Sequence, residues 1–337
     1  MSISDRRSRA LVLLASAALV AACSSPAHAQ GSLGSQREGT SSGTFLRIGV
    51  GARAEAMGES FVAVANDPSA IYWNPAGLAS LQQREVSGSY VDWPADIHYN
   101  HLAMIFPSRR LGGSIGFQVG VLGTRIQETT DLEPLGTGQE YSYSDLVVGA
   151  AYARRWTDKL LVGAGAKFVR EDLASELGGP TTSAVLFDVG SIFYLGLGSV
   201  RIATALLNFG PELKPSGQYV SPYSGEVRQY DGFDPPMVFH YGVAFEPLEN
   251  ASQRLTTSFE MNQPADNRQQ IKAGMEWSYR RIFALRTGYN FNADEIKLSM
   301  GAGFTADLGV CHGTLDYAYS DGGFLGGIQR VSLGVRF

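Results

Sequence analysis

Residues 296–304 read IKLSMGAGF, with an apolar side chain at every second position from Ile296 to Phe304 and small or polar residues between them. Successive side chains of a β-strand point to opposite faces, so this stretch predicts a strand with one apolar and one polar face. The same alternation recurs at residues 115–121, 162–168 and 271–277. The sequence therefore predicts a sheet of amphipathic strands.

The strands are long enough to cross a bilayer, which takes about nine to eleven tilted residues, whereas globular strands average about five or six. About fourteen are expected, at residues 85–92, 97–107, 111–125, 139–154, 160–171, 182–195, 199–209, 237–246, 253–262, 268–278, 281–290, 294–305, 311–320 and 328–337. Aromatic side chains gather at strand ends, as in the girdles of membrane barrels. These features favour an all-β, antiparallel transmembrane barrel over a soluble sandwich.

The connections between these strands differ in length in a regular way. Those at 126–138, 172–181 and 210–236 are long, and the ones that alternate with them are short. Outer-membrane barrels have long outer loops and short periplasmic turns. We therefore expect both termini in the periplasm.

The composition agrees with this class. Charged residues are 18% of the chain, below the roughly 25% of soluble domains. The net charge is −5, whereas nucleic-acid binding needs a basic surface, so no nucleic-acid partner is expected. The partner expected from the apolar strand faces is outer-membrane lipid.

The first residues predict export from the cytoplasm of a bacterium. A basic stretch at Arg6–Arg9 precedes an apolar one at Ala10–Ala22, and Ala27-His28-Ala29 has the pattern of a cleavage site, so residues 1–29 are expected to be a signal peptide. A second interpretation stays open. Residues 20–23 (VAAC) resemble a lipoprotein box, in which Cys23 would be acylated.

Residues 30–84 are expected to form a leader and a plug inside the barrel, because a barrel of this width cannot be filled by its own wall side chains. Asp67-Pro68 and Asn74-Pro75 each predict a capped helix start, with short helices at 68–73 and 75–80. Gly77 would permit close backbone approach. The plug could serve only to brace the barrel, or it could act as a gate or binding element.

The last strand has apolar residues at every second position and ends on Phe337. A terminal aromatic residue on an alternating strand resembles the assembly signal of bacterial outer-membrane barrels. Phe337 is therefore expected to serve as that signal.

Three passages resemble the PorV/PorQ family: residues 45–65 (FLRIGVGARAEAMGESFVAVA), 66–79 (NDPSAIYWNPAGLA) and 315–337 (LDYAYSDGGFLGGIQRVSLGVRF). The segment Asn74-Pro75-Ala76-Gly77 is similar, more distantly, to one in the FadL family, whose fold is a fourteen-stranded barrel with an N-terminal plug. The first resemblance implies a carrier or receptor in type IX protein secretion, with secreted proteins that carry C-terminal signal domains, and the secretion machinery, as partners. The second implies a transporter of hydrophobic small molecules. A diffusion porin is a third possibility, which a filled lumen would weaken.

No enzyme is expected. Residues 49–54 (GVGARA) match a loose dinucleotide fingerprint without the βαβ unit that it requires. Residues 112–116 (GGSIG) match a nucleophile elbow, but they open an alternating strand and not a strand-to-helix turn. His98 and His101 are three apart on a strand and so face opposite ways. No catalytic residue, cofactor or metal is assigned.

Overall fold

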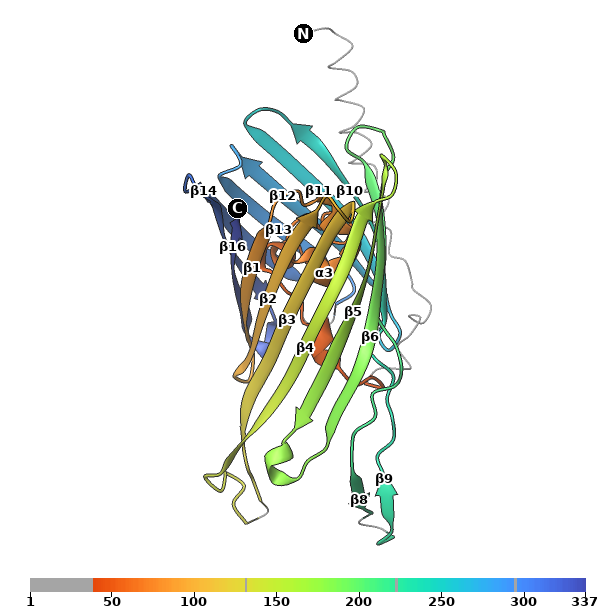
Figure 1. Cartoon of the computed structure of the whole chain (residues 1–337). Coiled ribbons are helices and arrows are strands. Elements are labelled where there is room, and N and C mark those ends of the chain that lie inside the picture. Colours follow the sequence, from red (N-terminus) through yellow and green to blue (C-terminus); the bar gives the residue numbers. More distant parts are fainter. Residues whose placement is uncertain (1–38, 131, 222–223, 294–295) are drawn as a thin grey trace, which may run out of the picture.

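The computed structural model describes residues 39–130, 132–221, 224–293 and 296–337. In these ranges fourteen strands form one closed barrel (Figure 1). They are β1 (Glu85–Trp93), β2 (Ile97–Ser108), β3 (Gly113–Gln127), β4 (Glu140–Arg155), β5 (Leu160–Leu173), β6 (Thr181–Tyr194), β7 (Arg201–Phe209), β10 (Val238–Glu249), β11 (Gln253–Pro264), β12 (Gln270–Tyr279), β13 (Phe283–Asn290), β14 (Leu298–Asp307), β15 (His312–Asp321) and β16 (Gly327–Arg336). Neighbours along the chain pair antiparallel, β7 pairs with β10, and β16 closes the ring on β1. The predicted fold class is confirmed, and each predicted strand agrees with an observed one to within four residues.

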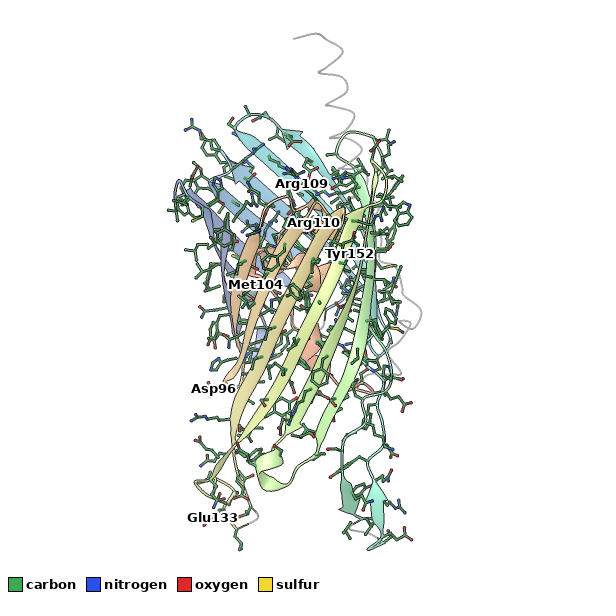
Figure 2. All side chains as sticks on the ribbon, viewed as in Figure 1. Asp96, Met104, Arg109, Arg110, Glu133 and Tyr152 are labelled. Carbon is green, nitrogen blue, oxygen red and sulfur yellow. The ribbon has the colours of Figure 1, made fainter. Side chains whose placement is uncertain are left out.

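The wall has an apolar outer face and a polar inner face, as the alternation predicted. On β3, Phe117 and Val119 are 48% and 40% exposed, whereas Gln118 between them is 5% exposed. Figure 2 shows Met104 and Tyr152 midway along the wall, with Arg109 and Arg110 near one end and Asp96 and Glu133 toward the other. An exposed apolar belt on a closed sheet is the surface that a bilayer requires.

The long connections gather at one end of the barrel and the short turns at the other, the bottom and top of Figure 1. The long connection 210–236 is not wholly irregular. It contains β8 (Gln218–Val220) and β9 (Val227–Gln229), which form a separate two-stranded sheet beyond the barrel. The long connection between β5 and β6 contains the short helix η4 (Ser175–Leu177). The connection between β15 and β16 contains the short helix η5 (Gly323–Leu325). We call the end of the barrel with the long connections the long-loop end, and the opposite end the short-turn end.

Four short helices precede β1 and lie inside the barrel: η2 (Thr44–Arg47), α2 (Ala52–Ala56), α3 (Ala70–Trp73) and η3 (Pro75–Ser80). The last two match the predicted helices, although α3 begins two residues later and η3 is a 3-10 helix. None of the helices in the described ranges is long and apolar enough to cross a bilayer. Residues 44–81 are called the plug below.

The described chain begins and ends at opposite ends of the barrel. The Ser42 amide donates to the Asp234 carbonyl at the long-loop end. At the short-turn end, the Phe337 amide donates to the Arg84 carbonyl. The N-terminus itself, the expected signal peptide at 1–29 and Cys23 lie outside the described residues, so a common side for both termini remains a prediction.

Candidate functional site

One side of the plug packs tightly against β3 to β6. The backbone of Pro75 approaches the wall so closely that a Cβ on Gly163 of β5 would collide with it, and only glycine leaves that space. Leu78 of the plug and Ile105 of the wall belong to one buried apolar cluster. This side is therefore held by shape and apolar contact.

Asn74 joins the plug to the wall. Its Oδ1 accepts the Ala76 amide at 3.1 Å and so caps η3. Its Nδ2 donates to the Val62 carbonyl within the plug at 3.0 Å and to the Ser191 carbonyl of β6 at 3.2 Å. A Cβ on Gly77 would collide with the Ala65 carbonyl. The Asn-Pro-Ala-Gly segment thus folds the plug on itself and fastens it to the barrel.

Asp67 stands where the sequence places a helix cap, and it also meets the ionic side of the plug. Its Oδ1 accepts the Ser69 amide at 3.0 Å, just after Pro68. Its Oδ2 accepts from Arg53 at 2.9 Å. The same carboxylate therefore orders the start of α3 and positions a charged side chain of α2.

The opposite side of the plug is fastened to the wall by charge. Arg53 donates through Nε and Nη2 to both oxygens of Glu276 on β12, at 2.7 and 2.9 Å. Arg286 of β13 donates to the same carboxylate at 2.7 Å and to Asp316 of β15 at 2.6 Å. Paired, charge-assisted hydrogen bonds of this kind are stronger than neutral ones. An ionic chain thus joins the plug to residues of three strands, β12, β13 and β15.

Two glutamates of α2 and the following turn make further links to the wall. Glu55 lies 2.9 Å from Arg330 on β16 and accepts from Ser320 at 2.7 Å. Burial raises the pKa of Glu55, and the Arg330 guanidinium opposes that rise. Glu59 lies 2.5 Å from Lys272 on β12. Burial acts to raise the pKa of Glu59, but the Lys272 ammonium outweighs it, so this pKa lies below its usual value.

Glu260 of β11 holds the plug backbone. Its Oε2 accepts the amides of Phe61 and Val62 at 2.7 and 2.8 Å. Its Oε1 lies 2.7 Å from Nδ1 of His240 on β10. Arg201 of β7 donates to the Ala63 carbonyl at 2.6 Å. The sequence assigned polar residues to the inner face but did not identify these partners.

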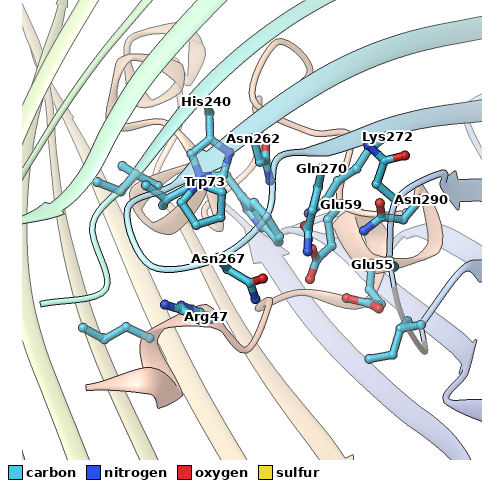
Figure 3. A pocket seen from close by; sticks show the side chains of 18 of the residues that line it. Arg47, Glu55, Glu59, Trp73, His240, Asn262, Asn267, Gln270, Lys272 and Asn290 are labelled. Carbon is cyan, nitrogen blue, oxygen red and sulfur yellow. The ribbon is translucent and has the colours of Figure 1, made fainter. Parts of the chain in front are cut away.

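A pocket of about 340 Å³ lies between the plug and the wall toward the long-loop end (Figure 3). In Figure 3, Trp73 and His240 lie on one side, and Glu59 and Lys272 lie on the other. Its floor is buried, with Lys272 2% exposed, whereas its rim includes the exposed Asn292. The pocket therefore opens at the long-loop end, and the plug closes it at its inner end.

A smaller cavity of about 210 Å³ lies on the other side of the plug, lined by Ala65, Ser80, Tyr194 and Arg254 among others. Arg201 and Glu246, which hold the Ala63 region of the plug in place, also line it. The plug therefore separates two spaces within the barrel.

The remaining residues singled out from the sequence, and the cysteine Cys311, lie away from the larger pocket. Phe337 is 60% exposed at the end of the last strand. His98 is exposed and His101 is 5% exposed on the inner face, so the two do point opposite ways. Cys311 is half-buried and free within the described chain, at the turn before β15.

Comparisons with known proteins concern the family and the fold. Residues 17–153, less than half of the chain, match the sequence profile described as Uncharacterised protein family (UPF0164). No curated protein matches the sequence. The fold is similar to that of the Ralstonia pickettii toluene transporter TbuX, with a TM-score of 0.56 at 14% identity over 86% of this chain and 97% of that one.

Two further solved structures are similar over the same shares of each chain. The CymD monoaromatic hydrocarbon channel has a TM-score of 0.55 at 14% identity, with 86% of this chain and 97% of that chain covered. The Pseudomonas putida toluene transporter TodX has a TM-score of 0.52 at 13% identity, with the same 86% and 97%. At these identities the likeness concerns the fold.

Proposed function

We propose that this protein is an outer-membrane transport barrel that binds a small solute on its outer side and passes it inward when the plug shifts. The observation that carries the proposal is the pocket, whose rim is exposed at the long-loop end and whose floor includes Glu55, Glu59 and Trp73 of the plug. A ligand there touches the element that blocks the lumen. In this proposal the long loops face outward, and the short turns and Phe337 face the periplasm.

The filled lumen favours a gated transporter over a diffusion porin. Glu276 and Glu260 fasten the plug on one side, and Gly163 and Ser191 lie against it on the other. Passage from the pocket to the smaller cavity therefore needs the plug to move. The likeness to a toluene transporter supports this architecture, although the amide and charged side chains in the pocket lining do not favour a hydrocarbon.

A reversible tether tests whether the plug moves. A Cβ built on Gly242 of β10 lies 3.7 Å from Cβ of Ala63, within the roughly 3.5–4.5 Å that a disulfide needs. Because the new side chain would also collide with Val62, Ala63→Cys and Gly242→Cys are combined with Val62→Ala, in a Cys311→Ser background. Uptake of radiolabelled glucose, glycine and toluene into proteoliposomes is then measured.

We expect uptake of one of these probes by the reduced protein, its loss on oxidation, and its return with dithiothreitol. The oxidised Ala63→Cys single variant is the control and should remain active. Uptake that is unchanged by the tether would show that the plug is not the gate and would refute the proposal.

The long loops favour a second candidate, a carrier or receptor for secreted proteins, which the resemblance to the PorV/PorQ family also supports. The sheet of β8 and β9 lies beyond the barrel and exposes Val220 and Val227 by 63% and 65%. Mild-detergent purification from native outer membrane, with mass spectrometry, tests this. Recovery of a secretion component by the full chain, and its loss when residues 218–229 are replaced by a short Gly-Ser turn, would support it; recovery of the barrel alone would contradict it.

A further inference from the structure

We propose that the pocket at the long-loop end takes a neutral, polyhydroxylated solute, the class of small saccharides. This inference rests on the proposed function, in which the pocket is the substrate site. It follows from the charge, the hydrogen-bonding groups and the size of the lining.

The charged side chains of the buried floor already have partners. Lys167 lies 2.8 Å from Asp188, and Lys272 lies 2.5 Å from Glu59. Glu55 faces Arg330 at 2.9 Å. Removing one member of a buried pair leaves an uncompensated charge, which is strongly unfavourable. A charged ligand would have to break such a pair, so a neutral ligand fits the floor best.

Six side-chain amides belong to the rest of the polar lining, together with His240, Ser299 and the cationic side chains Arg47, Arg268 and Lys297. The amides are Asn208, Asn262, Asn267, Gln270, Asn290 and Asn292. Each amide offers both donors and acceptors, as does each hydroxyl group. A ligand with many hydroxyl groups can therefore satisfy these amides from several directions at once.

Two polar atoms of the lining lack a partner among the described residues. They are Oδ1 of Asn290, whose residue is 8% exposed, and Oε2 of Glu55, whose residue is 2% exposed. A buried polar atom without a hydrogen bond is costly. Hydroxyl groups of a bound solute would donate to both atoms, whereas a hydrocarbon would leave them unsatisfied and would also exclude water from them.

The remaining lining is mostly apolar and includes three aromatic side chains. Tyr72, Trp73 and Trp93 line the same pocket, and Trp73 is labelled in Figure 3. Aromatic rings combine a large apolar surface with a polar edge, which suits the C–H faces of a pyranose ring. The volume of about 340 Å³ is near the lower end of the roughly 300–1,000 Å³ typical of ligand pockets. A mono- or disaccharide is therefore expected, and not a polymer.

Equilibrium binding to the full chain in detergent tests the class. D-Glucose and maltose are titrated by calorimetry and by tryptophan fluorescence, with glycine, sodium phosphate and toluene as comparison probes. We expect saturable binding of at least one sugar and none of the comparison probes at equal concentration. Asn290→Leu and Gln270→Leu should each weaken it by about tenfold, the loss of one hydrogen bond to a buried group.

The control is Gln139→Leu, which changes an exposed amide in loop 128–139 and should bind as the wild type does. The Asn290→Asp variant keeps the shape of the side chain. Heat-modified gel mobility reports whether each variant is folded. Three results would each overturn the inference. They are the absence of sugar binding, binding of toluene or glycine in place of sugar, and sugar binding that Asn290→Leu and Gln270→Leu leave unchanged.

Binding and transport fail separately. Sugar binding that survives in the oxidised Ala63–Gly242 tether, together with unchanged uptake, would refute the moving plug and leave the ligand class standing. Uptake of glycine or toluene that the tether blocks, without any sugar binding, would support the moving plug and refute the ligand class.

Discussion

Replacing Glu276 by Gln should loosen the plug, because Glu276 is the centre of the ionic chain. Its carboxylate accepts from Arg53 at 2.7 and 2.9 Å and from Arg286 at 2.7 Å. Removing one member of a buried pair costs about 3–5 kcal/mol. Arg53 keeps Asp67 and Arg286 keeps Asp316, so we expect the lower value, about 3 kcal/mol.

Urea unfolding of the detergent-solubilised barrel measures this change. At a slope of about 3 kcal/mol per M, the midpoint should fall by roughly 1 M. Trypsin should also cut after Arg53 in the variant at urea concentrations where the wild-type plug is protected. The matched control is Glu140→Gln, since Glu140 lies 3.9 Å from Arg125 and both side chains are more than half exposed. Such a pair contributes less than about 1 kcal/mol.

Equal midpoints for Glu276→Gln and Glu140→Gln would refute the reasoning that the ionic side holds the plug. An intermediate result can be resolved by Arg53→Met. If Arg53 and Glu276 act on each other, the double variant should lose less than the sum of the two single losses.

Asn74→Ala removes a helix cap and the bond to Ser191, and should lower stability by about 1–2 kcal/mol in the same urea assay. Gly163→Val places a side chain against the plug backbone, and should increase tryptic cleavage of the plug while the barrel still shows a folded gel mobility. The pKa of Glu59 lies below its usual 4.5 because of the nearby Lys272 ammonium. The contribution of this ion pair to stability is therefore complete above pH 4.5 and is lost as the pH falls through the lower pKa of the folded state. The Glu59→Gln variant should lack this part of the acid-induced fall in urea midpoint. Deleting Phe337 should reduce the amount of folded barrel in the outer membrane, measured by gel mobility of membrane fractions, without changing the urea midpoint of the protein that does fold.

The strands could be predicted because their signal is local. In β5 and β12, residues such as Phe168 and Met275 face outward, while Lys167 and Lys272 face inward, as the alternation requires. A one-residue error in reading this pattern would put Lys272 into the lipid, so the pattern leaves little freedom. In contrast, β8 and β9 have three residues each, too few for an alternation to be recognised.

The plug was harder to predict in detail. Gly51 and Gly58 bracket α2, and both have positive φ angles, of 85° and 62°. The helix between them has five residues, shorter than an isolated helix can sustain, and it forms because the barrel encloses it. Propensity alone therefore gives little indication of α2.

The site depended on contacts between distant residues. Arg53 and Glu276 are 223 residues apart, and their pairing follows from the docking of the plug and not from any local spacing. Asn74 and Gly77 could be singled out because the proline and glycine beside them have local meaning. The pocket is the space that the plug leaves unfilled, so its lining could be recognised only after the plug was placed.

The path of the plug through the barrel has a consequence for biogenesis. The chain is fastened at the long-loop end, where Glu171 accepts the Gly43 amide at 2.8 Å, and it leaves at the short-turn end to begin β1. Strand β1 also forms the seam with β16 that completes the ring. Strand β16, which is synthesised last, thus closes the barrel around the plug, which is synthesised before any strand. A nascent barrel that sealed this seam early would have to thread its own N-terminal segment through a finished cylinder, so the order of events favours plug first, seam last.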